Sequence, residues 1–598
     1  MLNSCFSYLK IGKSAYNGFT KKTIDFVSTV QLKDRNLWRK FVEVYGSGAD
    51  VIDNGWRGEY WGKMMRGACL TYAYTADREL YSVIEEAVFA LLEKQEGDGR
   101  ISTYPKDNEF RGWDMWCRKY VMVGLEYFYR ICNDSLKKQR ILTALKAHAD
   151  YIIKNIGDDK IPITKSSHIY GALNSCSILD AFLQLYLLTK EQRYLDFGKY
   201  ILDCGGTGEG NLIECLNKGL KPHEFPITKA YEMMSFFEGV LTYYECTGEE
   251  QYLHIVQRFF DAINETELAI VGGMGYQHEF FSDTKAMQTE TSTEPMLETC
   301  VTVTWIRILS RLLALTGEVK YADRIEISTY NALYGTLNFD GLEQFCYEKK
   351  CNLPGLPFDS YSPLFKAYRG DRIGGFKPLA DGTHYGCCAC IAAAAVALFP
   401  LGAVMTESEK IVVNYYLDGE SKIILNNGEK ANLIISTNYP TESKVAIKVV
   451  GETQSVFSLK LRIPNWCKKA SVWIAGRVYE AEKGYLLLKN VKSDEEIVLD
   501  LSMELEKVYL NGKTAFTRGP LVLARDEYKE NRKIDFDKME SIETIIELPY
   551  CEDEYYRCGA KTEDGEVIIL ADYKSCGKNW TSEFNLISVW LNVKEQVK

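Results

Sequence analysis

Four residues in two short motifs are of the types that bind a metal ion. Cys387 and Cys388 lie in the run Gly-Cys-Cys-Ala-Cys, and Glu298 and Cys300 lie in the run Leu-Glu-Thr-Cys. Thiolate sulfur and carboxylate oxygen are both good ligands for a tetrahedral zinc ion. The chemistry predicted from these motifs is therefore a zinc site formed by Glu298, Cys300, Cys387 and Cys388.

Both motifs need an irregular backbone if their side chains are to reach one metal ion. Adjacent cysteines cannot easily form a disulfide with each other, and a Glu-x-Cys step places its side chains on different faces of a helix. Each motif is therefore expected at a helix start or at a break. The alternative is that these are ordinary buried thiols, since the chain has 18 cysteines. Cys390, Cys346 and Cys351 are competing ligands, which we interpret as ordinary thiols.

The elements that position these residues are predicted to be helices from about residue 32 to 400, where apolar residues recur at intervals of three and four. A short connector recurs between them, at 189–194, 247–252 and 316–321, with a Thr five residues before a Tyr, and 75–81 is a looser copy. Such repeats are typical of stacked helical hairpins. Six hairpins closed on themselves form an (α/α)6 toroid around a pocket, and an open solenoid is the competing arrangement.

After about residue 404 the period changes to short alternating runs, such as 445–450 and 457–463, separated by turn residues. Several short strands at this spacing predict a β-sandwich. We therefore expect a multi-domain α and β protein, with an (α/α)6 helical toroid followed by C-terminal β-sandwich domains. The expected boundaries are 1–403 for the catalytic toroid, 404–512 for the β-sandwich and 513–598 for a second β-rich domain.

The composition is that of a large globular protein. A chain of 598 residues exceeds the size at which one core keeps growing, so two or three domains are expected. The formal net charge of −11 provides no basic surface for phosphate backbones, which argues against nucleic-acid binding. We find no secretory signal and no run of roughly 20 apolar residues that would span a bilayer. Scattered cysteines fit a reducing compartment, so we predict a cytoplasmic protein without a membrane partner, and a homodimer is left open.

Loops rich in glycine and aromatic residues interrupt the helical region, and such loops on a rigid scaffold often carry binding sites. Flat aromatic rings can stack on sugar faces. The candidate sugar contacts are Tyr104, Trp113, Asp114, Trp116, His168, His223, Glu232, Glu238, His278 and His384. For each of them, helix packing or an ordinary structural hydrogen bond is the competing interpretation.

Several longer motifs resemble the β-L-arabinofuranosidases of glycoside hydrolase family 127 and their relatives in family 146. The likeness runs through most of the chain. It includes Trp-Arg-Gly-Glu-Tyr-Trp-Gly-Lys at 56–63, Gly-Trp-Asp-Met-Trp-Cys-Arg-Lys-Tyr at 112–120, Gly-Gly-Met-Gly at 272–275, Glu-Thr-Cys at 298–300, His-Tyr-Gly-Cys-Cys at 384–388 and Arg-Gly-Pro-Leu-Val at 518–522. The Glu-Thr-Cys motif and the Cys-Cys pair together are specific, whereas the aromatic loops are individually weak.

This resemblance implies a toroid followed by β-sandwich domains, with zinc bound at the four positions named above. It also implies a retaining glycosidase acting on an oligosaccharide, in which Cys387 is the nucleophile and Glu279 is the acid/base. Zinc coordination would hold Cys387 as a thiolate, whereas a free thiol of pKa about 8.5 is mostly neutral in the cytosol. Asp283, Glu290 and Glu294 are competing carboxylates near Glu279.

The chain departs from the family pattern at some positions. The run that follows the adjacent cysteines is rich in alanine, and Glu238 stands where a substrate-binding histidine is frequent. The sugar is therefore left open between arabinofuranose and another acidic or modified pentose. Two further functions compete with hydrolysis: sugar binding with a purely structural zinc, and a toroidal isomerase or epimerase, because the same scaffold serves different chemistries.

Overall fold

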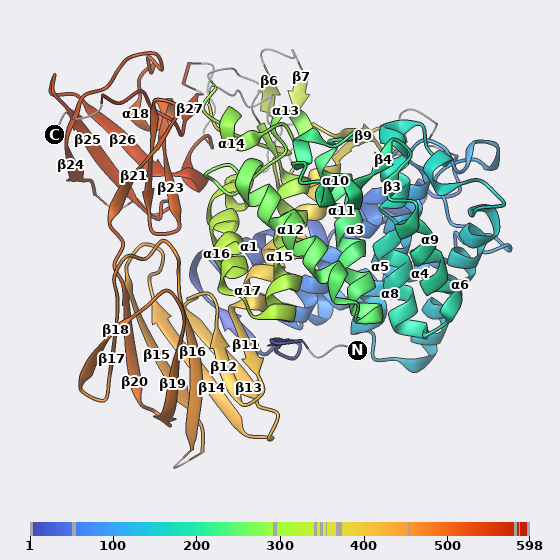
Figure 1. Cartoon of the computed structure of the whole chain (residues 1–598), viewed down its shortest axis with the longest axis horizontal. Coiled ribbons are helices and arrows are strands. Elements are labelled where there is room, and N and C mark those ends of the chain that lie inside the picture. The colour runs from blue at the N-terminus through green and yellow to red at the C-terminus, as the bar shows by residue number, and fades with distance from the viewer. Residues whose placement is uncertain are drawn as a thin grey trace.

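A computed structural model gives the arrangement of the chain. It describes residues 4–48, 50, 55–290, 296–339, 344–346, 351–353, 356–365, 374–452, 455–549, 551–578, 583–584 and 586–594. Helices dominate the chain up to Ala403, and strands dominate from Val404 onward (Figure 1).

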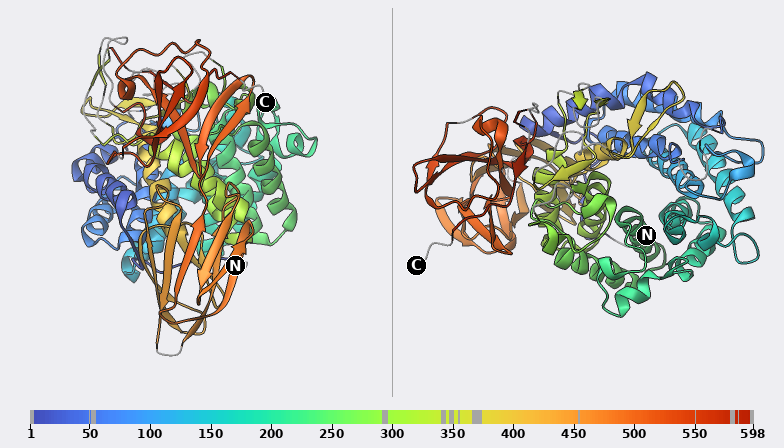
Figure 2. Two further views of the ribbon diagram at one scale, coloured as in Figure 1. Left: turned by 90° about the vertical axis from the view of Figure 1, so that its left-hand side faces the viewer. Right: turned by 90° about the horizontal axis from the view of Figure 1, so that it is seen from above.

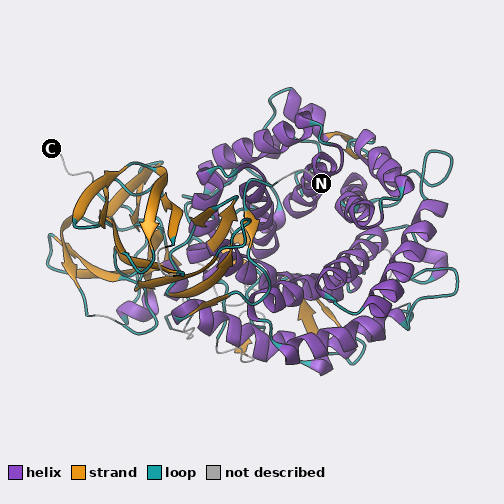
Figure 3. Ribbon diagram, turned by 90° about the horizontal axis from the view of Figure 1, so that it is seen from below, coloured by secondary structure: helices purple, strands orange, loops and turns teal. Residues whose placement is uncertain are grey.

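The inner layer of the helical part is a closed ring. Among the described residues it consists of α3 (Gly58–Thr75), α5 (Asp114–Ile131), α7 (Leu173–Cys176) with α8 (Leu179–Thr189), α11 (Ala230–Thr247), α15 (Thr299–Thr316) and α17 (Cys387–Ala403). Each contacts the next around the ring, and α17 also contacts α3, which closes it (Figures 2 and 3). The predicted toroid is therefore confirmed, and the open solenoid is excluded.

The outer layer consists of amphipathic helices that cover the inner ones. They are α1 (Gly18–Val27), α2 (Arg35–Glu43), α4 (Arg78–Leu92), α6 (Ser135–Asn155), α9 (Gln192–Asp203), α12 (Glu250–Thr266) and α16 (Val319–Ser328). On α4, for example, Leu80, Ile84 and Leu91 are buried while Arg78 and Glu79 are exposed. The inner helices are buried nearly all round because both of their faces are covered.

The repeated connectors each join an inner helix to an outer helix. Thr189, Thr247 and Thr316 are the last residues of their inner helices. Each hydroxyl accepts a hydrogen bond from the backbone N–H two residues further on, at 3.2, 3.3 and 3.2 Å respectively. Thr75 makes the same contact with the N–H of Asp77, at 3.2 Å. The threonine therefore stabilises the turn that reverses the chain direction, which explains why it recurs.

Two sheets follow the toroid. One has the order β1-β11-β12-β16-β19, with β1 Ser7–Tyr8, β11 Val404–Glu407, β12 Lys410–Val413, β16 Val456–Ile463 and β19 Gly484–Lys492. The other has the order β18-β17-β20-β15-β14-β13-β2, with β18 Arg477–Ala481, β17 Ala470–Ile474, β20 Glu496–Leu501, β15 Lys444–Val450, β14 Lys430–Thr437, β13 Gly419–Ile424 and β2 Ser14–Tyr16. Alternate residues of β14, β15 and β16 are buried, as the predicted β-sandwich requires.

The N-terminal segment completes an edge of both sheets. β1 pairs antiparallel with β11, and β2 pairs antiparallel with β13. This pairing could not be predicted from the sequence, because strands of two and three residues are too short to show an alternating pattern.

A third sheet lies nearer the C-terminus. Its strands are β21 (Leu505–Leu510), β22 (Lys513–Arg518), β23 (Leu521–Asp526), β26 (Val567–Asp572), β25 (Arg557–Thr562) and β24 (Ile542–Glu547) in that order, and β27 (Ile587–Ser588) pairs with β23. β21 and β22 are antiparallel neighbours on either side of the predicted boundary at residue 512. The division of the chain into domains stays a prediction.

Two apolar segments, Ile169–Thr189 and Thr299–Thr316, are long and apolar enough to cross a membrane by length and composition alone. However, 72% and 78% of their most apolar windows are buried inside the protein. Both contribute to the inner layer of the ring, where such burial is expected of a core helix. They are therefore weak support for a membrane span.

Candidate active site

The amino ends of several inner helices converge on one cavity of about 320 Å³, a volume within the usual range for small-molecule sites. The lining comes from the starts of α3, α5, α11 and α17 and from the segments that precede the inner helices. The lining residues are Trp56, Glu59, Lys63, Trp113, Trp116, Tyr170, Lys229, Tyr231, Glu232, Glu279, Glu298, Gly375, Phe376 and Cys387. The positive ends of the helix dipoles lie toward this cavity, which favours anionic groups there.

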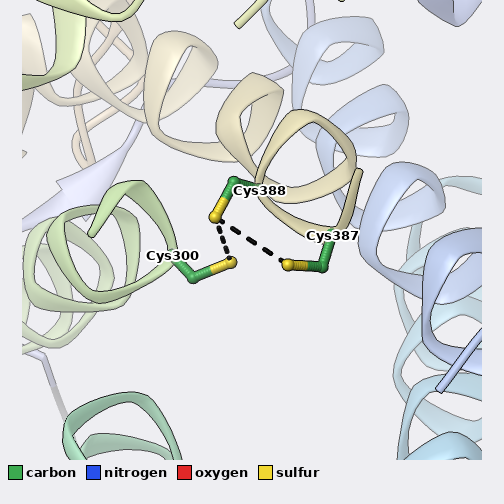
Figure 4. A group of neighbouring side chains, drawn as sticks. All are labelled: Cys300, Cys387 and Cys388. Carbon is green, nitrogen blue, oxygen red and sulfur yellow. Dashed lines mark hydrogen bonds between the residues drawn. The ribbon is translucent and has the colours of Figure 1, made fainter. Parts of the chain in front are cut away.

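Three thiols meet at the starts of α15 and α17 (Figure 4), and Cys387 among them lines the cavity. Cys387 and Cys388 are the first two residues of α17, and Cys300 is the second residue of α15. The Sγ atom of Cys388 lies 3.2 Å from that of Cys300 and 3.9 Å from that of Cys387. All three sulfur atoms lie within 4.8 Å of one another, and all three residues are buried.

Glu298 adds a carboxylate to this group. It ends strand β5 (Met296–Glu298) and is the N-cap residue of α15. Its Oε1 lies 3.7 Å from the Sγ atom of Cys388. Its Oε2 is buried and has no hydrogen-bond partner in the described part of the chain. The three thiols are a group that could hold a metal ion, and the orphaned carboxylate oxygen of Glu298 lies beside them. Both motifs lie at a helix start, as expected from the sequence.

The three thiols differ in acidity. Hydrogen bonds from Cys300 and Cys388 lower the pKa of Cys387 well below its usual value, and the ammonium groups of Lys63 and Lys229 act in the same direction against burial. Burial raises the pKa of Cys300 and that of Cys388 well above the usual value. Cys387 is therefore the thiol of the cluster that ionises most readily.

Glu59 and Lys63 belong to this site, although they were not among the predicted site residues. Lys63 Nζ lies 3.7 Å from the Sγ atom of Cys300 and 3.1 Å from Glu59 Oε2. The indole N–H of Trp116 donates to the same carboxylate. Both charged residues are buried in α3. Two opposite charges four residues apart in a largely apolar segment, which also contains Arg66, are the signal in the sequence that could have identified them.

Glu279 lines the same cavity at the end of the short helix α13 (Tyr276–Glu279). Its carboxylate forms an ion pair with the buried Lys229 and accepts a hydrogen bond of 3.2 Å from the Tyr361 hydroxyl. Its φ angle of 86° is in the left-handed region, which is costly for a residue other than glycine. The competing carboxylates Asp283 and Glu290 do not line the cavity, and Glu294 lies outside the described residues.

Trp113, Trp116 and Glu232 are the predicted sugar contacts that line the cavity. The Trp113 and Trp116 rings lie edge to face, with centroids 6.0 Å apart. Burial raises the pKa of Glu232, and the charge of nearby Lys229 opposes this shift. These residues combine aromatic surface with a carboxylate, which suits a sugar ring and its hydroxyls.

Tyr104, Asp114 and Glu238 are buried but do not line the cavity. The Tyr104 hydroxyl donates a hydrogen bond of 2.7 Å to the Gly55 carbonyl and accepts one of 3.1 Å from the backbone N–H of Trp113. Asp114 accepts a hydrogen bond of 2.9 Å from Arg118, and Glu238 accepts one of 2.9 Å from Arg307. These polar groups hold the scaffold in place, which was their competing interpretation.

The predicted histidines do not line the cavity in the described part of the chain. His223 Nδ1 lies 2.6 Å from Glu267 Oε1, and His168 is exposed. His384 is exposed on β10 (His384–Gly386), where its ring lies edge to face with that of Phe376, a lining residue, at 5.8 Å. The side chains of His278, Cys346 and Cys351 lie outside the described residues. Cys390, the other competing thiol, is buried in α17 and is not part of the cluster.

Comparison with known proteins gives matches along most of the chain. The catalytic-domain model of glycoside hydrolase family 127, described as β-L-arabinofuranosidase, matches residues 19–352, and the middle-domain model of that family matches residues 410–503. A non-reducing end β-L-arabinofuranosidase from Bifidobacterium longum subsp. longum is 23% identical over 522 residues, which cover 78% of this chain and 74% of the relative.

Two solved structures share the fold. A family 127 β-arabinofuranosidase is 18% identical, with a TM-score of 0.78, over 99% of this chain and 98% of the other. A family 127 β-L-arabinofuranosidase from Geobacillus stearothermophilus is 19% identical, with a TM-score of 0.72, over 98% of this chain and 100% of the other. The similarity therefore extends over the toroid and the β-rich part together.

Proposed function

Because this chain belongs to glycoside hydrolase family 127 and is therefore a glycosidase, we propose that it is a retaining β-L-arabinofuranosidase that acts on an oligosaccharide. The observation that carries the proposal is that Cys387 and Glu279 line one cavity. Retention requires a nucleophile and a separate acid/base residue near the same glycosidic bond. Cys387 suits the first role because, of the three clustered thiols, it is the one that lines the cavity.

The reaction would proceed in two displacements. In the first, the sulfur of Cys387 attacks the anomeric carbon while Glu279 donates a proton to the departing glycosidic oxygen, so a carbon–sulfur bond forms as the carbon–oxygen bond breaks. In the second, Glu279 takes a proton from a water molecule, whose oxygen attacks the same carbon and releases the thiolate. Two inversions at one carbon give net retention of configuration.

We infer that zinc is the metal that Glu298, Cys300, Cys387 and Cys388 would hold. Three sulfur donors and one carboxylate oxygen suit this ion, and the unpartnered Oε2 of Glu298 supports a metal between them. When bound, zinc would supply the divalent charge that keeps coordinating thiols ionised near neutral pH. Lys63, at 3.7 Å from the Sγ atom of Cys300, would offset the negative charge of the ligand set.

The position of Cys387 favours hydrolysis over the competing functions. A purely structural zinc would be enclosed by its ligands, whereas Cys387 lines the cavity in which Trp113, Trp116 and Glu232 are positioned to contact a sugar. Its thiol is therefore within reach of a bound substrate.

Hydrolysis of an aryl β-L-arabinofuranoside tests the proposal. We expect the wild type to release the aryl alcohol and Cys387→Ser to lose at least about 1,000-fold in kcat, because a hydroxyl is a far weaker nucleophile than a thiolate. Cys390→Ala is the matched control, since this thiol lies in the same helix but outside the cluster. It should keep its activity, and metal analysis should find about one zinc per chain in both active proteins. No turnover of pentofuranosides by the wild type would refute the proposal.

A further inference from the structure

A second cleft is lined by residues of the outer helices α12 and α16 and of the β-rich part of the chain. It consists of two adjoining cavities of about 340 and 570 Å³. They share Asn264, Arg324, Ile327 and Trp466, and the smaller one extends to residues of β21, β22 and β23. None of the residues that line this cleft lines the active-site cavity, so the two sites are separate.

Three cationic side chains in this cleft form no ion pair in the described part of the chain, although the carboxylate of Asp323 lies near Arg324 and that of Glu265 near Lys285. Lys285, Arg324 and Lys483 line it, and in the described part of the chain no salt bridge or side-chain hydrogen bond engages any of them. The carboxylate of Asp323 is engaged by Arg462 at 2.6 Å. Arg324 is half-buried; burial lowers its pKa, and the charge of Asp323 opposes this shift. The cleft therefore holds more cations than carboxylates, with Lys285, Lys320, Arg324 and Lys483 against Asp261 and Asp323, in a chain whose net charge is −11.

Aromatic rings border the same charges. Trp466 is half-buried, and Tyr509 is 59% exposed. Aromatic faces stack on the apolar faces of sugar rings, and a guanidinium binds a carboxylate through two parallel hydrogen bonds. Cations beside exposed rings therefore complement a ring that carries an acid group, whereas a neutral sugar would leave the charges unpaired.

We propose that this cleft between the outer helices and the β-rich part of the chain is a second carbohydrate-binding site, and that its ligand is a saccharide bearing a carboxylate. Arg324 would bind the carboxylate, Lys285 and Lys483 would add positive charge around it, and Trp466 and Tyr509 would contact the sugar rings. The site would hold an acidic glycan independently of catalysis.

Titration calorimetry with digalacturonic acid tests this site. We expect digalacturonic acid to bind the wild type, and neutral galactobiose and inorganic phosphate each to bind at least about 10-fold more weakly, because each offers only part of the complementary chemistry. Arg324→Met should weaken the binding of digalacturonic acid about 10-fold. Arg477→Met is the matched control, because this arginine is exposed on β18 and does not line the cleft, and it should bind as the wild type does.

The outcomes separate this proposal from the proposed hydrolysis. Cys387→Ser protein should bind digalacturonic acid with unchanged affinity, so loss of turnover does not affect the test. Equal affinity in wild type and Arg324→Met, or phosphate binding as tight as that of digalacturonic acid, would overturn the proposal. If Arg324→Met fails to fold, Tyr509→Ala and Lys483→Met replace it, since both side chains are exposed. Unchanged affinity of both variants for digalacturonic acid would likewise overturn the proposal.

Discussion

At the residue scale, Lys229 determines how the proposed acid/base residue is held. It is 3% exposed and forms an ion pair with Glu279. Burial acts to lower the pKa of Lys229, but the negative charges of Glu232, Glu279 and Glu298 raise it well above its usual value. Lys229 is therefore a permanent cation that cannot supply a proton itself, and we expect it to position the Glu279 carboxylate.

Replacing Lys229 should slow the hydrolysis of different substrates to different extents, according to their leaving group. We expect Lys229→Met to lower kcat for methyl β-L-arabinofuranoside at least about 10-fold more than for the 4-nitrophenyl glycoside, because a poor leaving group depends most on the positioned acid. Lys229→Arg keeps the cation and should recover part of the loss. Steady-state kinetics with both substrates check this, and an equal loss for the two would point to general disruption instead.

At the element scale, a buried histidine joins an outer helix to the loop before α5. His148, on α6, is fully buried, and its Nδ1 accepts a hydrogen bond of 3.2 Å from the Ile101 N–H. Burial lowers the pKa of His148 from 6.5 to about 3, and the charge of Arg118 acts in the same direction. The contact between α6 and this loop therefore requires a neutral imidazole.

This histidine should make the protein sensitive to acid. Below a pH of about 6.5 the unfolded chain binds a proton at His148 that the folded protein excludes, so the free energy of unfolding falls by about 1.4 kcal/mol per pH unit until the pH reaches about 3. His148→Asn keeps an acceptor for Ile101 but does not titrate. Thermal melting between pH 7 and 4.5 should show a shallower decline for the variant, and parallel declines would contradict the assignment.

At the scale of the whole molecule, buried charges join the toroid to the sandwich. Arg462, on β16, is fully buried, and its guanidinium lies 2.6 Å from Asp323 and 2.6 Å from Glu326, both on α16. The Tyr439 hydroxyl donates to Glu326 at 2.6 Å. The N-terminal strands add a second connection, because β1 and β2 pair with strands of the sandwich. The ring and the sandwich are therefore held together by specific contacts.

Removing the central cation of this connection should destabilise the protein. Arg462→Met leaves two buried carboxylates without a counter-charge, and breaking such a buried ion pair costs about 3–5 kcal/mol. The melting temperature should fall by several degrees. Arg477→Met, at an exposed position of the same sandwich, should leave it nearly unchanged. Similar melting temperatures for the two variants would show that the buried ion pairs contribute little to stability.

Much of this architecture could be predicted from the sequence because its signals are local. The three- and four-residue period, the Thr-to-Tyr connectors and the later alternation each reflect contacts within a short stretch of chain. The resemblance to family 127 is confirmed. The candidate metal-ligand motifs were recognisable because thiols and a carboxylate are chemically distinctive, and both motifs occur at helix starts. The cytoplasmic location, the homodimer and the domain boundaries stay predictions.

The partners of the remaining polar residues could not be predicted, because they depend on how the ring closes. Closure places α17 beside α3, more than three hundred residues apart in the chain, and so brings Lys63 to Cys300. Packing around the ring also pairs Glu238, on α11, with Arg307, on α15, at 2.9 Å, and Glu238 does not line the cavity. A buried charge has a role that depends on what lies opposite it, and only the tertiary structure decides that. Residue type and local period, by contrast, are properties of the sequence alone.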